Sequence, residues 1–198
     1  MKIVSSVHLT ENRVCFGSSR ADITGFSNLN ELRCLLLEMP WSVTGDLDDF
    51  GRGSSAVRFA QLGVLLLAGD YGSAVPDDCA IFGWNGRGCL AENIRYFDDF
   101  VSNGKVSGRG NLFVATLPTI PCCEAAITLG IHGHAAYFHT DPSTEKLFRL
   151  ISCGNHRFSI AVEINQSDAT LLLLENTPDD TVYPDCNSLK ELFFSVLL

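Results

Sequence analysis

The sequence predicts a layered α/β domain. Segments with strand-like and helix-like hydrophobic patterns alternate along its 198 residues. A hydrophobic share of 46% with only 19% charged residues is typical of a well-packed globular chain. This length suits one domain, or one half of a larger two-part fold.

The first predicted helix covers residues 29–38, with Asn28 or Asn30 as its N-cap and Pro40-Trp41 as its end. A second helix is predicted over residues 54–68, with Ser54 as cap and Gly69 as stop. Apolar residues lie on all sides of this second helix, so we expect it to be buried all round.

A short buried strand is predicted at residues 79–82, after a Pro-Asp-Asp turn. An amphipathic helix follows, with Asp98 and Asp99 facing water. Its apolar stripe consists of Leu90, Ile94, Phe97 and Val101. Residues 102–111 then form a predicted Gly/Ser-rich loop that carries Lys105 and Arg109.

Residues 110–143 are predicted to contain a loop, an apolar helix closed by Gly130, and a short buried strand. A further helix is then expected, with Asp141 as cap, Pro142 as its first residue and Glu145 in its first turn. A strand that turns into a helix N-terminus is where many enzymes hold a nucleophile, because unpaired N–H groups favour negative charge there. The turn at residues 139–144 contains no cysteine.

Two strands and a helix are predicted for the last third of the chain. Residues 157–164 alternate between apolar and polar types, which predicts one inward face, and residues 169–174 form another strand. Ser188 with Glu191 three positions later forms a capping box that opens the final helix. Its apolar residues are Leu189, Leu192, Phe193 and Val196.

Charge and composition exclude several functions. The 14 basic and 23 acidic residues give a net charge of −9, which argues against a nucleic-acid surface and gives no help in docking an acidic carrier protein. No apolar run is long enough to span a membrane, and the N-terminal apolar stretch is too short for a secretory signal. We therefore expect a cytoplasmic protein.

Eight cysteines are scattered without a C-x-x-C pair, and most stand in apolar segments. Buried free thiols are the expected state. The cysteines are Cys15, Cys34, Cys79, Cys89, Cys122, Cys123, Cys153 and Cys186.

Two segments carry a family resemblance. The turn Phe50-Gly51-Arg52 before a long helix, and NLFVATLPTIPCCEAAITLGIHG at residues 111–133, resemble the β-ketoacyl-ACP synthases of the thiolase-like superfamily. The match runs in order to a strand that ends in Val162-Glu163. The resemblance implies a layered thiolase-like fold with a mixed sheet flanked by helices, and residues 1–198 as a single N-terminal-type half domain.

The resemblance also implies an active-site cysteine in the first half and two histidines in a second half. This chain resembles the first half alone. Counting forward from Gly133 aligns Thr140-Asp141-Pro142 with the family's threonine-alanine-cysteine, whereas counting back from Gly154 puts Tyr137 at the cysteine. The two registers indicate a deletion, and neither supplies a cysteine. His134 is a further departure, because the family has a proline there.

The sequence gives weaker signals for other nucleophiles, for a metal site and for a cofactor site. Ser143 with His139 as base would form a displaced dyad, and Cys122 or Cys123 at a helix start would be a displaced thiol nucleophile. His132, His134 and His139, taken with Cys122 and Cys123, have a spacing that matches no zinc pattern, so no metal is predicted. Residues 83–88 lack a P-loop lysine and are interpreted as a connecting loop, so no cofactor is predicted.

The sequence thus predicts a catalytically silent accessory or chain-length-factor-type subunit in fatty-acid or polyketide assembly. The alternatives are an active acyltransferase or condensing enzyme that uses a displaced nucleophile or a second half in trans, and a simple acyl-binding module. A half domain would leave an apolar face uncovered, so we expect a homodimer or a complex with a ketosynthase-type subunit. Acyl carrier protein is a further candidate partner if Arg52, Lys105 and Arg109 form a basic patch.

Overall fold

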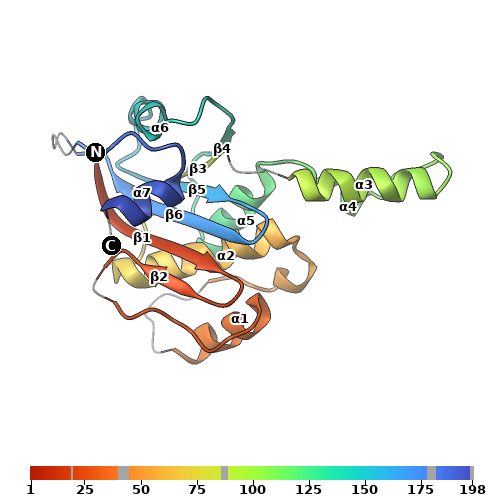
Figure 1. Ribbon diagram of the computed structural model, residues 1–198, viewed down its shortest axis with the longest axis horizontal. Coiled ribbons are helices and arrows are strands. Elements are labelled where there is room, and N and C mark those ends of the chain that lie inside the picture. The colour runs from red at the N-terminus through yellow and green to blue at the C-terminus, as the bar shows by residue number, and fades with distance from the viewer. Residues whose placement is uncertain (19, 40–44, 86–88, 178–181, 197–198) are drawn as a thin grey trace.

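The computed structural model describes residues 1–18, 20–39, 45–85, 89–177 and 182–196, which form a six-stranded mixed sheet with helices on both faces (Figure 1). The strand order is β2-β1-β6-β5-β3-β4. β3 is parallel to β4 and β5, and the other neighbours are antiparallel. The strands are β1 (Lys2–Thr10), β2 (Val14–Phe16), β3 (Ala80–Trp84), β4 (Ala135–Phe138), β5 (Phe158–Ile164) and β6 (Asp168–Glu175).

The helices form two layers around this sheet. α2 and α5 cover one face, and α6 and α7 cover the other. The helical segments are α1 (Leu29–Glu38), the 3-10 turn η1 (Phe50–Arg52), α2 (Ser55–Tyr71), α3 (Leu90–Ser102), α4 (Gly110–Val114), α5 (Ile120–Leu129), α6 (Thr144–Ser152) and α7 (Leu189–Val196).

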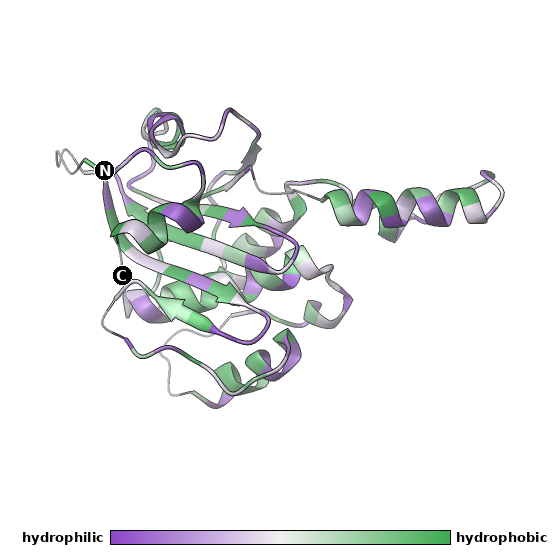
Figure 2. Ribbon diagram, in the orientation of Figure 1, coloured by the Kyte–Doolittle hydropathy of each residue, from purple (hydrophilic) through white to green (hydrophobic). Residues whose placement is uncertain are grey.

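The alternation of side chains along the strands creates two cores. In β6, Leu171 and Leu173 pack with α2 on one face, whereas Leu172 and Leu174 pack with α6 and α7 on the other. Figure 2 shows the resulting run of apolar residues along the central strands. The sheet is therefore buried on both faces, as is typical of a three-layer α/β fold.

Two strands were missed, and two strand predictions need correction. β1 and β2 were not predicted. β5 is buried on both faces through Glu163, and not only on its alternating apolar face, because helices cover both sides. β4 is half-buried and lies at the sheet edge, in place of the buried strand that was expected.

The helix boundaries also differ from prediction. α2 runs past Gly69 to Tyr71 and ends at Gly72, whose φ of 77° is left-handed. The cap of α6 is Ser143, and the predicted cap Asp141 instead pairs with Lys146 at 3.0 Å. The helix thus begins at Thr144, two residues later than predicted, and Pro142 lies before it.

The remaining caps agree with the sequence. Asn28, not Asn30, caps α1 by accepting the N–H groups of Asn30 and Glu31. Ser54 caps α2, and the Ser188 hydroxyl accepts the Glu191 N–H at the start of α7. Of the apolar residues named for this helix, Leu189, Leu192 and Phe193 are buried and Val196 is exposed. Pro40-Trp41 lies outside the described residues.

α3 and α4 form an arm that projects from the body (Figure 1). The short helix α4 occupies the end of the predicted loop 102–111 and the residues after it. Asp98 faces water as predicted, but Asp99 is half-buried and pairs with Arg109 at 3.1 Å.

All eight cysteines are free thiols, as predicted, and five are buried. Cys34 and Cys153 are exposed, and Cys123 is half-buried. No helix within the described residues has the length and apolarity needed to cross a bilayer.

Candidate functional site

The candidate site lies where the parallel strands β3 and β4 end side by side. Trp84 is in register with Phe138, so Asn85 and His139 follow at the same edge of the sheet. The N-terminus of α6 comes next in the chain. In open α/β sheets, ligands bind in the crevice outside the carboxyl ends of the strands. Gly83 and Trp84 belong to β3, which corrects the prediction of a loop from residue 83, and residues 86–88 lie outside the described part of the chain.

The turn after β4 is fixed to the end of β3 by two hydrogen bonds. The Thr140 N–H donates to Asn85 Oδ1 at 3.0 Å, and the indole N–H of Trp84 donates to Thr140 Oγ at 3.1 Å. The Thr140 hydroxyl in turn donates to the carbonyl of Asp141 at 3.2 Å. His139 is exposed. The turn that the forward register aligns with a catalytic cysteine is therefore a structural connection.

The hydroxyl of Ser143 takes part in two structural hydrogen bonds. It accepts the Lys146 N–H at 3.2 Å and donates to Asp185 Oδ1 at 2.9 Å. The same carboxylate oxygen accepts the Glu145 N–H at 3.1 Å, and this bond lowers the pKa of Asp185. Among the hydrogen bonds of the described residues, none joins His139 to Ser143. The Ser143 proton thus goes to the Asp185 carboxylate, which also holds the start of α6 in place, and no histidine is hydrogen-bonded to this hydroxyl among the described residues.

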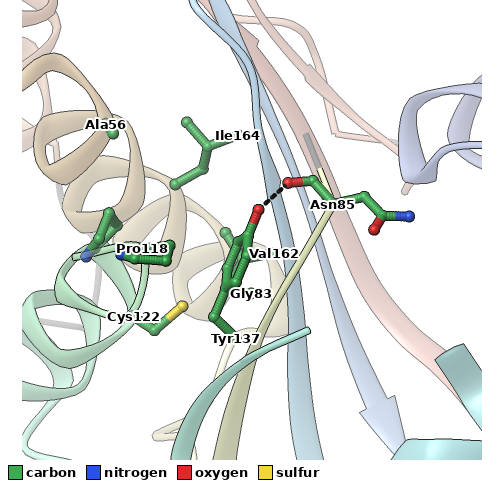
Figure 3. A pocket seen from close by; sticks show the side chains of 9 residues that line it. Ala56, Gly83, Asn85, Pro118, Cys122, Tyr137, Val162 and Ile164 are labelled. Carbon is green, nitrogen blue, oxygen red and sulfur yellow. Dashed lines mark hydrogen bonds between the residues drawn. The ribbon is translucent and has the colours of Figure 1, made fainter. Parts of the chain in front are cut away.

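Cys122 and Tyr137 lie beside each other in a small apolar pocket behind this turn (Figure 3). Tyr137 is in register with Gly83, and its hydroxyl donates to the Asn85 carbonyl at 2.5 Å. A β-carbon on Gly83 would stand 2.8 Å from both Cys122 Sγ and the Tyr137 ring, so only glycine admits both side chains. The cavity left between them is about 20 Å³, room for a single water molecule. The pocket is lined by Ala56, Gly83, Asn85, Pro118, Pro121, Cys122, Tyr137, Val162 and Ile164.

Burial makes Cys122 a poor nucleophile. The residue is 2% exposed, and removal from water raises the pKa of its thiol to about 12, against the smaller effect of a Gly83 backbone hydrogen bond. Burial also raises the pKa of the Tyr137 hydroxyl. Both groups are therefore neutral near pH 7.

Cys122 is expected to react with iodoacetamide at pH 8 at least roughly 100-fold more slowly than Cys34 and Cys153, because little of its thiol is ionised and reagent cannot reach it. The measurement is peptide mass spectrometry of the native protein over time. Labelling in urea supplies the control, since all three thiols should then react at similar rates. Equal native rates would mean that the pocket opens readily.

Cys123, the other thiol candidate, is half-buried in the first turn of α5. Thr119 precedes this helix and makes no side-chain cap bond. Because Cys123 is half-buried and Cys122 is buried, Cys123 is the more accessible thiol, and it defines the test of an active enzyme below.

The sequence analysis considered His132, His134 and His139 together, but in the structure His134 lies beside His156. His134 Nδ1 lies 2.8 Å from His156 Nε2, and His156 Nδ1 lies 3.2 Å from the Asp78 carbonyl oxygen. This bridge joins the segments that lead into β3, β4 and β5, and sequence reasoning missed it because the two histidines are distant along the chain. Within the described ranges, no three His, Cys, Asp or Glu side chains are grouped as metal ligands.

The arginines of the predicted basic patch are each engaged. Arg52 pairs with Asp49 at 3.1 Å, and Arg109 pairs with Asp99 at the same distance. These ion pairs reduce the positive potential that a carrier protein would meet.

Neither the protein-family models nor the curated proteins contain a match to this sequence. Solved structures do match. A chain of the ketosynthase ApeO in complex with its chain length factor ApeC from Xenorhabdus doucetiae superposes with a TM-score of 0.57 and 15% identity, over 89% of this chain and 79% of that one. The ishigamide ketosynthase/chain length factor matches with a TM-score of 0.58 and 11% identity, over 92% of this chain and 63% of that one.

The chain has a ketosynthase-type fold. The resemblance found in residues 50–163 is therefore confirmed at the level of the fold, together with the layered α/β class and the mixed sheet. This chain spans less than two thirds of the ishigamide protein's chain. Within this ketosynthase-type fold, the strand-turn-helix connection is intact, and the described side chains at the turn are engaged in structural bonds.

Proposed function

We propose that this chain is a catalytically silent accessory subunit of chain length factor type, which acts beside a ketosynthase-type subunit in polyketide or fatty-acid assembly. One observation carries the proposal: the turn between β4 and α6 holds Thr140, Asp141 and Pro142, followed by a Ser143 whose hydroxyl is engaged by Asp185. A ketosynthase needs an available thiolate at this turn. This chain keeps the connection without the nucleophile.

The two structural neighbours support a paired role. Each comes from an assembly in which a ketosynthase is described together with a chain length factor. This chain spans 79% of the matched Xenorhabdus chain, so a chain not much longer than this one takes part in that complex. These facts support a ketosynthase-type partner and an N-terminal-type half domain at residues 1–198.

An acyl-transfer assay separates the silent subunit from an active enzyme. We expect no covalent adduct by intact mass after incubation with octanoyl-CoA or malonyl-CoA, because Cys122 is protonated and buried and the Ser143 hydroxyl is held by Asp185 in a structural hydrogen bond, with no histidine bonded to it. An adduct that disappears in Cys123→Ala but persists in Cys122→Ala would contradict the proposal and favour a displaced thiol. An adduct lost only in Ser143→Ala would favour the serine.

The accessory role has its own measurement. A ketosynthase-type protein from the same genome is purified alone and after co-expression with this chain, and product from malonyl-loaded carrier protein is measured by mass spectrometry. We expect product only from the co-expressed pair. Equal product from the ketosynthase alone would remove the accessory role.

A further inference from the structure

A pair of hydrogen-bonded histidines joins the turn before β5 to the segments before β3 and β4. His134 Nδ1 lies 2.8 Å from His156 Nε2, and His156 Nδ1 lies 3.2 Å from the Asp78 carbonyl oxygen. The pair lies at the amino ends of the parallel strands, whereas the candidate site lies at their carboxyl ends. The proposed function makes no use of these two histidines.

The two hydrogen bonds fix the positions of the ring protons. A carbonyl oxygen only accepts, so His156 Nδ1 carries the proton that it donates to Asp78. In a neutral imidazole the other nitrogen is an acceptor, so His156 Nε2 accepts the proton of His134 Nδ1. His134 Nε2 is therefore the unprotonated nitrogen of its ring, and it belongs to an exposed residue.

This arrangement accepts one further proton but not two. The first proton binds to His134 Nε2 and leaves both hydrogen bonds in place, with a charged donor in the bond between the rings. The second proton binds to His156 Nε2, which is the acceptor of that bond. Two N–H groups and two positive charges then face each other, so the rings separate.

The charged groups around the pair are of both signs. Asp77 and Asp78 line the same groove of about 320 Å³, together with a third histidine, His132. Arg157 follows the pair in the chain, and its guanidinium is paired with Glu175 at 3.1 Å. The groove thus offers carboxylates as partners for charged imidazoles once the two rings have separated.

The histidine pair holds the turn at residues 153–157 against the neighbouring segments. The segments before β3 and β4 are joined to each other by backbone hydrogen bonds on both sides of Gly133. Pairing of β5 with β3 begins at Ser159. Among the described residues, every hydrogen bond from the turn to those two segments involves His156. Loss of the pair therefore frees the turn and leaves the segments before β3 and β4 joined.

The turn is continuous with the end of α6. This helix ends at Ser152, and the N–H groups of Cys153 and Gly154 donate to the carbonyls of Arg149 and Ile151 in its last turn. The other end of α6 is the turn of the candidate site. A freed turn at residues 153–157 therefore loosens α6 at the end that lies away from this site.

We propose that His134 and His156 form a pH-sensitive switch, which holds the turn at residues 153–157 in place near neutral pH and releases it when both imidazoles are protonated. Histidines ordinarily change charge between about pH 5 and 8, so this range is where the release is expected. The inference does not depend on the proposed function.

Amide hydrogen exchange tests the switch. The isotope-labelled full chain is measured by NMR at pH 7.5 and pH 5.0, and each rate is corrected for the intrinsic effect of pH on exchange. We expect the protection of the Cys153 and Gly154 amides to fall at least about 5-fold at pH 5.0, because their hydrogen bonds lie beside the freed turn. The protection of Leu172 in the central strand β6 should not fall.

His134→Asn and His132→Asn are matched variants for this measurement. The asparagine amide at position 134 can donate to a neutral His156 and, after rotation, accept from a protonated one, so the fall in protection should disappear. His132→Asn changes another exposed histidine of the same groove, and the fall should stay as in the wild type. An equal fall in both variants, or no fall in the wild type, would overturn the proposal.

The positions of the ring protons give a readout that a merely structural pair would not change. Long-range proton–nitrogen NMR spectra at pH 8 should show neutral rings protonated at Nδ1 for both His134 and His156. At pH 5.0 both nitrogens of both rings should be protonated. A proton on Nε2 of His156 at pH 8, or a His156 ring that is still neutral at pH 5.0, would contradict the switch.

Discussion

Replacing Gly133 by alanine is expected to lower the free energy of unfolding by about 3 kcal/mol or more. A β-carbon there would overlap the carbonyl oxygen of Cys79 and stand 2.7 Å from that of Asp78. Both atoms belong to the backbone that leads into β3, so no side-chain rotation relieves the overlap. The two segments are also tied by hydrogen bonds from the His132 N–H to the Asp77 carbonyl and from the Ile81 N–H to the His134 carbonyl.

Urea unfolding followed by circular dichroism under reducing conditions measures this effect. Gly51→Ala is the matched control, because a β-carbon at Gly51 meets nothing within 4 Å, and we expect a change within about 0.5 kcal/mol. A loss below about 1 kcal/mol for Gly133→Ala would mean that the segments before β3 and β4 separate at little cost.

Local signals made the helices predictable. Asn28, Ser54 and Ser188 each cap the helix that follows within a few residues, so the sequence contains both partners of the interaction. The spacing of apolar residues also predicted the amphipathic helix α3. The pattern identified an apolar side, but not that its outer half would face away from the body, because that depends on where the arm projects.

The first strand was missed because its buried polar residues have distant partners. The Ser5 hydroxyl donates to Asp70 of α2 and also lies within 3.1 Å of the Leu67 carbonyl oxygen, and His8 is hydrogen-bonded to Thr170 of β6. In the sequence these residues interrupt an apolar run. Only the folded chain supplies the groups that make their burial acceptable.

The sequence predicted that the candidate site has no cysteine, but it did not predict the side chains and hydrogen bonds found there. Both registers removed the cysteine, and the structure places structural hydrogen bonds at the turn. The contact of Tyr137 with Cys122 follows from the parallel pairing of β3 with β4 across Gly83. Asp185 is hydrogen-bonded to Ser143 from a distant segment. Neither this hydrogen bond nor the contact of Tyr137 with Cys122 joins neighbours in the sequence, so no local pattern predicts them.

Glu163→Gln is expected to stabilise the protein at pH 8 by about 1–2 kcal/mol and to leave it equal or slightly weaker at pH 5. Glu163 is buried at the end of β5, where its carboxylate accepts the Leu189 N–H at 2.5 Å at the start of α7. Burial raises the pKa of Glu163 from 4.5 to about 7, although the hydrogen bonds from Leu189 and Lys190 oppose the shift. Asp168 adds to the rise, while its own charge is held by Lys190 at 2.7 Å.

The sign of the pH dependence follows from proton binding. Between pH 4.5 and 7 the folded chain keeps the Glu163 proton that the unfolded chain releases, so this contribution to stability is full below pH 4.5 and is lost as the pH rises through 7. The shift corresponds to at most about 3 kcal/mol. Glutamine keeps an acceptor for Leu189 without the charge, and its extra N–H group costs part of that gain.

His8 acts in the opposite direction. Burial against Phe193 and Phe194 lowers the pKa of its imidazole from 6.5 to about 4, so its contribution is present above pH 6.5 and is lost as the pH falls through 4. The two groups together place maximum stability between about pH 4.5 and 6.5, below the usual neutral range. Both lie against α7, since Phe193, Phe194 and Leu189 belong to this helix.

Urea unfolding of the wild type and Glu163→Gln at pH 5, 6, 7 and 8 therefore measures how α7 is held on the sheet. The two stability curves should cross between pH 5 and 7, and the variant should keep its stability at pH 8. Glu11→Gln, a substitution at an exposed turn, should give a curve parallel to the wild type. Parallel curves for Glu163→Gln would mean that water reaches this carboxyl, and α7 would then dock mainly through Leu189, Leu192 and Phe193.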